Sequence, residues 1–144
     1  MDKITMINHS DYFRSYDIQY INDLTEEIRQ SARVTIIRVN KLITALQQNE
    51  IALQINPRYD SVVNSGWRPP AINAAIPTAA LASKHMLGQA CDLHDPGGDI
   101  DEWCMTHQNE LSEIGLWLEH PSATKNWCHV QTVAPRSGRR VFYP

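Results

Sequence analysis

Cysteine is scarce in this sequence: only three of its 144 residues are cysteines, and no two of them form a Cys-x-x-Cys pair. An odd, scattered set of this kind argues against both a disulfide framework and a zinc ribbon. Long apolar runs are missing too. No stretch approaches the roughly 18 consecutive apolar residues of a membrane-spanning helix, and the opening residues MDKITMINHS lack the apolar segment of a signal peptide. We therefore expect a chain made in the cytoplasm, which needs some other export route for any work outside it.

An excess of either charge is also absent. Thirteen Lys and Arg residues against 16 Asp and Glu residues give a net charge of −3, which is atypical of a domain that binds nucleic acid. With 42% hydrophobic and 20% charged residues, the composition is that of an ordinary globular protein. A chain of 144 residues predicts one domain. We expect a monomer that binds neither nucleic acid nor membrane.

Residues 1–57 are predicted to form a mainly helical first part of this domain. Apolar residues recur at spacings of three and four between Asn22 and Gln48, which predicts one long helix. Asn22 is a suitable N-cap, and Asn56-Pro57 lies beyond the helix end. We interpret this helix as scaffold.

Residues 58–144 are predicted to form the rest of the domain, mostly as strands. Short apolar or alternating runs predict strands at 59–67, 89–94, 115–119, 127–133 and 139–143. One helix is predicted at 100–114, capped by Asp99 or Asp101 and ended by Gly115. Helices in the first and middle parts, with strands clustered late, predict a single α+β domain with a mostly antiparallel sheet flanked by helices.

The segment from Ser83 to Asp92, SKHMLGQACD, holds the first candidates for chemistry. His85 and Asp92 are seven residues apart, so they cannot share one helix face, but a loop can deliver the histidine and a strand the aspartate. Gly88 gives the chain between them freedom to bend. Imidazole nitrogen and carboxylate oxygen are both good zinc ligands, and catalytic zinc keeps three protein ligands and a water. His129, in a later predicted strand, is the third candidate ligand.

Strand geometry separates the cysteines from this group. Successive side chains point to opposite faces of a strand, so Cys91 faces away from Asp92 and Cys128 faces away from His129. We interpret both, and Cys104 in the predicted helix, as reduced, buried apolar residues. The other four histidines are interpreted as surface or core residues: His9, His94, His107 and His120. If His129 is not a ligand, His94 or His120 is the next candidate.

Four motifs follow one another in the second part of the chain: Ser-Gly-Trp-Arg at 65–68, Asn73, Ser-x-His-x-x-Gly-x-Ala-x-Asp at 83–92 and Trp-x-His at 127–129. Together they resemble the zinc D-Ala-D-Ala carboxypeptidase and L-alanyl-D-glutamate endopeptidase family, which has a hedgehog/DD-peptidase-like fold. These enzymes cut peptidoglycan stem peptides, and the group includes many small phage endolysins. The resemblance covers the chain from Ser61 to the end.

The resemblance implies a role for each matching residue. It implies that Zn²⁺ is held on the sheet by His85, Asp92 and His129. It also implies that Arg68 contacts the substrate or the polarised carbonyl, and that Ser83 supports the site where substrate binds. Zinc lowers the pKa of its bound water and polarises the scissile carbonyl, while arginine offers a fork of donors to a carboxylate or a developing oxyanion. The alternative for Arg68 is a surface arginine at a turn.

The general base departs from the family pattern. Members of the family commonly have Asp or Glu three residues before the last histidine, where this sequence has Asn126, whose carboxamide cannot take a proton. If the strands on either side of Asn126 pair as a hairpin, Glu119 lies opposite Trp127 and diagonal to His129, on the zinc-facing side. Diagonal partners are roughly 7 Å apart, and a glutamate side chain can reach across that gap. We therefore predict Glu119 as the catalytic base. The competing carboxylates are Asp95, Asp99 and Asp101.

The sequence thus predicts a zinc peptidase of the phage-lysin type, which waits in the cytoplasm until it is released to the cell wall and acts there on peptidoglycan peptides. Which peptidoglycan bond it cuts stays open. One alternative is a non-catalytic, zinc-bearing module of the same fold, acting in cell-wall binding or as a phage structural component. Another is a metal-free structural domain with coincidental histidines. Three basic residues near the end either contact anionic wall polymers or belong to a solvated loop: Arg136, Arg139 and Arg140.

Overall fold

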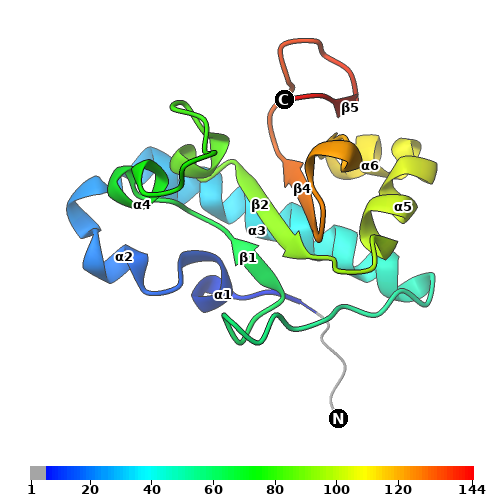
Figure 1. Cartoon of the computed structure of the whole chain (residues 1–144), viewed down its shortest axis with the longest axis horizontal. Helices are drawn as coiled ribbons and strands as arrows, with labels where there is room; N and C mark the ends of the chain where they lie inside the picture. The colour runs from blue at the N-terminus through cyan, green and yellow to red at the C-terminus, as the bar shows by residue number, and fades with distance from the viewer. Residues whose placement is uncertain (1–5) are drawn as a thin grey trace.

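A five-stranded sheet lies at the centre of the computed structural model, which describes residues 6–144 (Figure 1). The strand order is β1-β2-β4-β3-β5, and neighbouring strands are antiparallel except for β3 and β5, which are parallel. The strands are β1 (Val63–Ser65), β2 (Ala90–His94), β3 (Trp117–Glu119), β4 (Trp127–Gln131) and β5 (Val141–Phe142). The prediction of an α+β domain with a mostly antiparallel sheet is confirmed.

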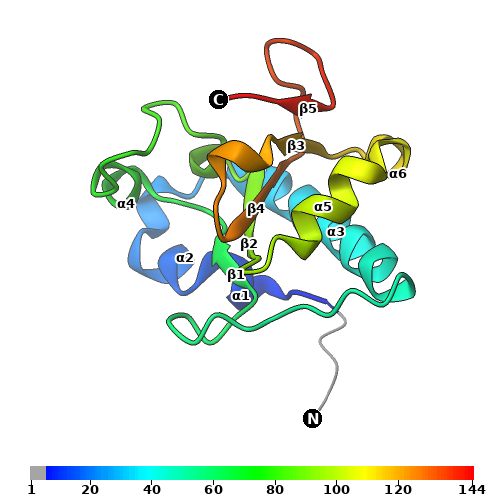
Figure 2. The same cartoon turned by 45° about the vertical axis from the view of Figure 1, so that its right-hand side comes forward.

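Helices precede and interrupt these strands. Within residues 6–144 the α-helices are α1 (His9–Phe13), α2 (Tyr16–Gln19), α3 (Glu26–Gln48), α4 (Pro70–Ala74), α5 (Asp99–Thr106) and α6 (Gln108–Ile114). The 3-10 helices are η1 (Ile21–Asp23), η2 (Lys84–Leu87) and η3 (Pro121–Ala123). Figure 2 shows α3 running behind the sheet, with α5 and α6 beside its last strands.

Helix α3 is the scaffold that the apolar spacing predicts, although it begins later than expected. One face is buried against the sheet and its neighbours through Ala32, Thr35, Val39, Leu42, Ile43 and Leu46. The N-cap is Thr25, whose hydroxyl accepts a hydrogen bond from the Ile28 amide at 3.1 Å. The predicted cap Asn22 is wrong because that residue lies inside η1. No helix in the part of the chain that the structure describes is long and apolar enough to cross a membrane.

The predicted helix at 100–114 is in fact two helices, because His107 interrupts it. The backbone of His107 leaves the helical region at φ −129° and ψ 46°. Its ring stacks on Trp103 with the ring centroids 4.2 Å apart, and its Nδ1 lies 2.8 Å from the Trp103 carbonyl oxygen. Gly115 ends α6, as predicted.

The start of α5 is capped from outside the helix. The Asp95 carboxylate accepts hydrogen bonds from the amides of Ile100 and Asp101 at 3.0 and 2.9 Å. This corrects the prediction that Asp99 or Asp101 caps the helix: both lie within its first turn, and the turn after β2 carries Asp95 back to the free amides.

The first strand is shorter than the alternating pattern predicts. Of the predicted residues 59–67 only Val63–Ser65 form β1. The residues before it form a turn, which is closed by a bridge between Asn56 and Ser61. The turn places Tyr59 beside the sheet rather than in it.

The sheet has a core face and a site face. The side chains that point toward the helices are buried in the hydrophobic core: Cys91, Leu93, Leu118, Cys128 and Val130. Asp92 and His129 alternate with these residues and point the other way. All three cysteines are free and buried, so the interpretation of them as reduced core residues is confirmed.

Gly88 joins η2 to the sheet and provides a test of this packing. Its φ is +72°, and a Cβ there would lie 2.9 Å from the carbonyl oxygen of Ile28 in α3. We expect Gly88→Ala to lower the free energy of unfolding by about 1–3 kcal/mol more than Gly98→Ala. Gly98 is the matched control, because its φ of +76° imposes similar strain while no heavy atom lies within 4 Å of the added Cβ. Urea unfolding measures both values, and equal losses would contradict the close packing of Gly88 on α3.

Candidate metal centre

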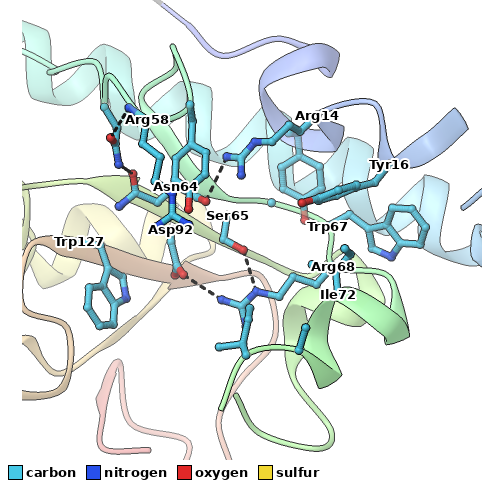
Figure 3. A pocket seen from close by; sticks show the side chains of 16 residues that line it. Arg14, Tyr16, Arg58, Asn64, Ser65, Trp67, Arg68, Ile72, Asp92 and Trp127 are labelled. Carbon is cyan, nitrogen blue, oxygen red and sulfur yellow. Dashed lines mark hydrogen bonds and ion pairs between the residues drawn. The ribbon is translucent and has the colours of Figure 1, made fainter. Parts of the chain in front are cut away.

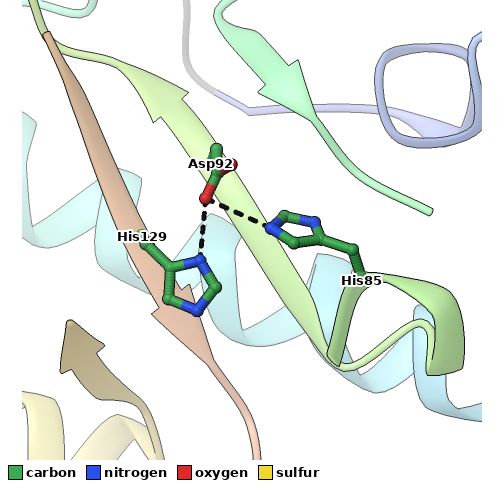
Figure 4. Close-up of side chains that lie close together, drawn as sticks. All are labelled: His85, Asp92 and His129. Carbon is green, nitrogen blue, oxygen red and sulfur yellow. Dashed lines mark hydrogen bonds and ion pairs between the residues drawn. The ribbon is translucent and has the colours of Figure 1, made fainter. Parts of the chain in front are cut away.

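Three of the predicted site residues converge on the site face of the sheet (Figure 4). His85 comes from η2, Asp92 from β2 and His129 from β4, and Asp92 and His129 are direct partners in the β2–β4 register. One potential ligand atom from each residue lies within 4.8 Å of the others. The structure therefore brings together the three residues that the sequence selected, and this group can hold a metal ion.

The geometry of His85 leaves one ring nitrogen ready for a ligand. The Ser83 hydroxyl accepts a hydrogen bond from the His85 amide at 3.2 Å and so starts the η2 turn. The ring Nδ1 lies 2.8 Å from the Gly66 carbonyl oxygen, which can only accept, so Nδ1 carries the hydrogen. Nε2 is then a lone-pair nitrogen; it is buried without a hydrogen-bond partner and lies 3.3 Å from Asp92 Oδ1. Burial lowers the pKa of His85, which keeps this lone pair available.

His129 is held from both sides of its ring. Its Nδ1 lies 2.8 Å from Asp92 Oδ1, and its Nε2 lies 3.0 Å from Gln131 Oε1. The Gln131 amide nitrogen donates to the Val133 carbonyl at 3.0 Å, which fixes its oxygen toward the ring. Burial alone would lower the pKa of His129, but the hydrogen bond to Asp92 and its negative charge raise it.

Gln131 is a site residue to which the sequence analysis gave no role. It is 4% exposed, and as the acceptor for His129 Nε2–H it orients the ring so that Nδ1 faces Asp92. Such a residue hydrogen-bonds the ring nitrogen of a ligand histidine that does not face the metal. Replacing it typically lowers metal affinity by about 10–100-fold. The available signal was the strand period of two, which puts residues 129 and 131 on one face.

Asp92 is the charged centre of the group. Burial opposes its ionisation, but the nearby His85 ring and the hydrogen bond from His129 hold its pKa well below the usual range. Arg68 adds a further contact, with Nη2 3.3 Å from Asp92 Oδ2. The carboxylate is therefore ionised near neutral pH, as a metal ligand must be.

Arg68 is anchored at the edge of this group rather than free on the surface (Figure 3). Its Nε donates to the Ser65 hydroxyl at 2.8 Å and its Nη1 donates to Asn73 Oδ1 at 3.4 Å. Its backbone amide donates to the His85 carbonyl at 3.1 Å. The Ser-Gly-Trp-Arg motif and Asn73 thus meet the His-to-Asp motif in space, and Arg68 lines a cavity of about 560 Å³ together with Asp92.

Glu119 lies on the same face, through a different register from the predicted one. Trp117 pairs with Gln131 in the β3–β4 ladder, and the next position along is also paired. Continuing this register brings Glu119 level with His129, not with Trp127. The predicted pairing is wrong by two residues, and because side chains alternate with a period of two, the shift keeps Glu119 on the same face. Burial raises the pKa of half-buried Glu119, and its negative charge acts on His129.

The competing carboxylates lie elsewhere. Asp95 is occupied in capping α5. Asp101 accepts from the Thr124 hydroxyl at 3.3 Å and is raised to a pKa of about 6 by burial, on the core side next to Cys128. Asp99 is exposed in the first turn of α5. The family position for the base, Asn126, is exposed in a left-handed turn conformation.

The remaining histidines lie outside this group. His9 pairs with Asp17, His120 stacks on Tyr143, and His94 ends β2. Within residues 6–144 none of them joins the cluster of His85, Asp92 and His129.

The donor set fits zinc. Two imidazole nitrogens and one carboxylate oxygen are ligands that zinc accepts, and three protein ligands are the number that a catalytic zinc site keeps. The buried, unpartnered Nε2 of His85 is a further sign of fit, because such an atom is costly unless something binds it. No protein-family model, curated protein or solved structure matches the chain.

These pKa shifts predict how zinc binding depends on pH. Asp92 is already ionised and His85 already neutral near pH 7, so His129, whose pKa is raised, is the group that must release a proton. Below that pKa, which lies above the ordinary histidine value of about 6.5, we expect the apparent zinc affinity to fall about tenfold per pH unit. Calorimetric titrations with zinc in two buffers of different protonation enthalpy count the released proton.

The matched controls for this titration are His129→Ala and His9→Ala. The first should abolish zinc binding, and the second, which changes an exposed histidine away from the cluster, should leave it unchanged. Full zinc binding by His129→Ala would contradict the ligand assignment and turn attention to His94 or His120.

Proposed function

We propose that this protein is a zinc-dependent peptidase that cleaves peptidoglycan stem peptides, as a D-Ala-D-Ala carboxypeptidase or an L-Ala-D-Glu endopeptidase. The observation that carries the proposal is the buried group of His85, Asp92 and His129, with Arg68 and Glu119 beside it. The choice of peptidoglycan as substrate comes from the sequence resemblance. In this proposal the protein is a monomer that waits in the cytoplasm and acts after release to the cell wall.

The ligands would hold zinc through Nε2 of His85, the carboxylate of Asp92 and Nδ1 of His129. Bound there, zinc would lower the pKa of a water molecule and polarise the scissile carbonyl. Gln131 keeps the His129 ring in the orientation that binding requires, and the Gly66 carbonyl does the same for His85.

Glu119 takes the role of general base. It accepts a proton from the attacking water and later passes it to the leaving amine. A carboxylate whose pKa is raised by burial is a stronger base than an exposed one, and its pKa is closer to neutral pH, where general bases work best.

Arg68 binds the substrate next to the reacting bond. Its contacts with Ser65 and Asn73 hold the guanidinium in place, so little side-chain freedom is lost when substrate arrives. The planar fork of donors suits a peptide carboxylate or the negative charge that develops on the carbonyl oxygen.

Glu119 also favours an enzyme over a non-catalytic zinc module. Burying part of the Glu119 carboxylate is unfavourable. Its negative charge lies close to that of Asp92, although His85, Asp92 and His129 already provide three ligands for a metal. A module that only binds zinc gains nothing from this arrangement, whereas a hydrolase needs a base there.

The proposal is tested by zinc analysis followed by a peptidoglycan turbidity assay. We expect about one zinc per chain, loss of turbidity that stops with a chelator, and recovery when zinc is added back. Asp92→Ala should lack both zinc and activity. Full zinc content without cleavage of peptidoglycan or its stem peptides would overturn the peptidase and leave the binding module.

The base is tested by Glu119→Gln. This change keeps the shape and removes the proton acceptor, so zinc content and fold should persist while the turnover rate falls by a factor of about 10² or more. Glu113→Gln, at an exposed glutamate of α6, is the matched control and should retain activity. Near-normal turnover in Glu119→Gln would move the role to another carboxylate, and loss of zinc would make Glu119 part of the metal site.

Arg68→Lys tests the substrate contact. Lysine keeps the positive charge but cannot reproduce the fork of donors, so we expect normal zinc content and melting temperature with a turnover rate lowered at least tenfold. Steady-state kinetics on a stem peptide measure the effect. Unchanged kinetics would show that Arg68 makes no specific contact with substrate.

A further inference from the structure

The cavity beside the candidate metal centre carries two further arginines that the proposed chemistry does not use. It has a volume of about 560 Å³, within the range of ligand-binding pockets. Asp92 and Arg68 line it near the metal centre, and Arg14 and Arg58 also line it. In the view of Figure 3 these two arginines lie above Asp92 and Arg68 lies below it.

Arg14 is fixed in place with donors left over. Its Nη2 donates to the carbonyl oxygens of Val63 and Asn64 at 2.7 and 3.1 Å, and its guanidinium carbon lies 3.8 Å from the centre of the Tyr59 ring. Its backbone is left-handed at φ 49°, and Ser15 follows at φ 62°. This left-handed conformation ends α1, because Arg14 is the C-cap of that helix and its amide donates to the Ser10 carbonyl. Among residues 6–144 its guanidinium hydrogen bonds come from Nη2, so the N–H groups on Nε and Nη1 are free to donate to a ligand.

Arg58 lies against the same aromatic ring. Its guanidinium carbon is 5.2 Å from the centre of the Tyr59 ring. It is exposed, and within the described residues its guanidinium has no hydrogen bond and no carboxylate at ion-pair distance. Tyr59 thus gathers two guanidinium groups whose charges are not neutralised by the protein.

The cavity offers no internal anion to these two groups. Among the described residues that line it, Asp92 is the one carboxylate, and it is already engaged by the two histidines and Arg68. Two cations held on one ring with free donors are the arrangement that binds an external oxyanion, since charge-assisted bonds from arginine to a carboxylate are strong and directional.

We infer that Arg14 and Arg58, on the Tyr59 ring, bind a free carboxylate of the peptide substrate at a distance from the bond that is cut. This inference rests on the proposed function, because it assigns the rest of the cavity to the same peptide. It makes the protein selective for acidic stem peptides over those whose carboxylates are amidated.

The test uses three stem pentapeptides that differ only in charge: one with all carboxylates free, one with the D-glutamate α-carboxyl amidated and one with the C-terminal carboxyl amidated. Binding to the metal-free full-length chain is measured by calorimetry, and cleavage by the zinc-loaded chain is measured separately. We expect one of the two amides to bind about tenfold or more weakly than the free acid. That difference should disappear in Arg58→Gln.

Two further variants complete the design. Arg33→Gln, at an exposed arginine of α3 that does not line the cavity, should keep the preference. Arg14→Gln should lose it, and because Arg14 also binds backbone carbonyls, its melting temperature is measured beside that of Arg58→Gln, which removes no such bond.

The outcomes separate this inference from the proposed function. Cleavage without a preference between acid and amide, or a preference that survives in Arg58→Gln and Arg14→Gln, overturns the carboxylate subsite and leaves the peptidase. A preference that the arginine variants abolish, in a protein that cuts none of the peptides, supports the subsite and overturns the peptidase. Neither binding nor cleavage of any of the three peptides overturns both.

Discussion

The rest of the site depends on the contacts that compensate the buried charge of Asp92. It is 6% exposed, and its oxygens lie 2.8 Å from His129 Nδ1 and 3.3 Å from His85 Nε2 and Arg68 Nη2. A buried charge is tolerated only when its partners compensate for the lost hydration. Three different segments are therefore bound to one position in β2: the η2 turn, the strand β4 and the end of the Ser-Gly-Trp-Arg motif.

The same balance explains why the group suits a metal. In the structure the positive charge beside Asp92 comes from the Arg68 guanidinium and from the His129 ring, whose raised pKa favours its protonated form. A divalent cation held by His85, Asp92 and His129 would supply this charge instead, and the buried Nε2 of His85 would gain a partner. The surrounding hydrogen bonds from Gly66 and Gln131 already hold both rings in the required orientation.

The cavity joins parts of the chain that the sequence separates. Tyr12, Arg14 and Tyr16 come from the mainly helical first part, yet they line the same cavity as Arg68 and Asp92. The hydroxyl of Tyr12 donates to the Ala90 carbonyl at 2.8 Å, which ties α1 to β2. Because of this contact, the first part is more than scaffold: it forms one wall of the proposed substrate site.

The sequence by itself determined the α+β class, the long scaffold helix, the core positions of the cysteines and the three ligand candidates, because each depends on local spacing or on strand parity. The role of Asp95 as cap, the break at His107, the partner role of Gln131 and the β3–β4 register were decided only by tertiary packing. Glu119 illustrates both contributions. Strand parity placed it on the same face as His129, but only the β3–β4 register makes His129, and not Trp127, its cross-strand partner. Arg14 and Arg58 had no signal at all, because their place beside Asp92 depends on contacts between segments far apart in the chain.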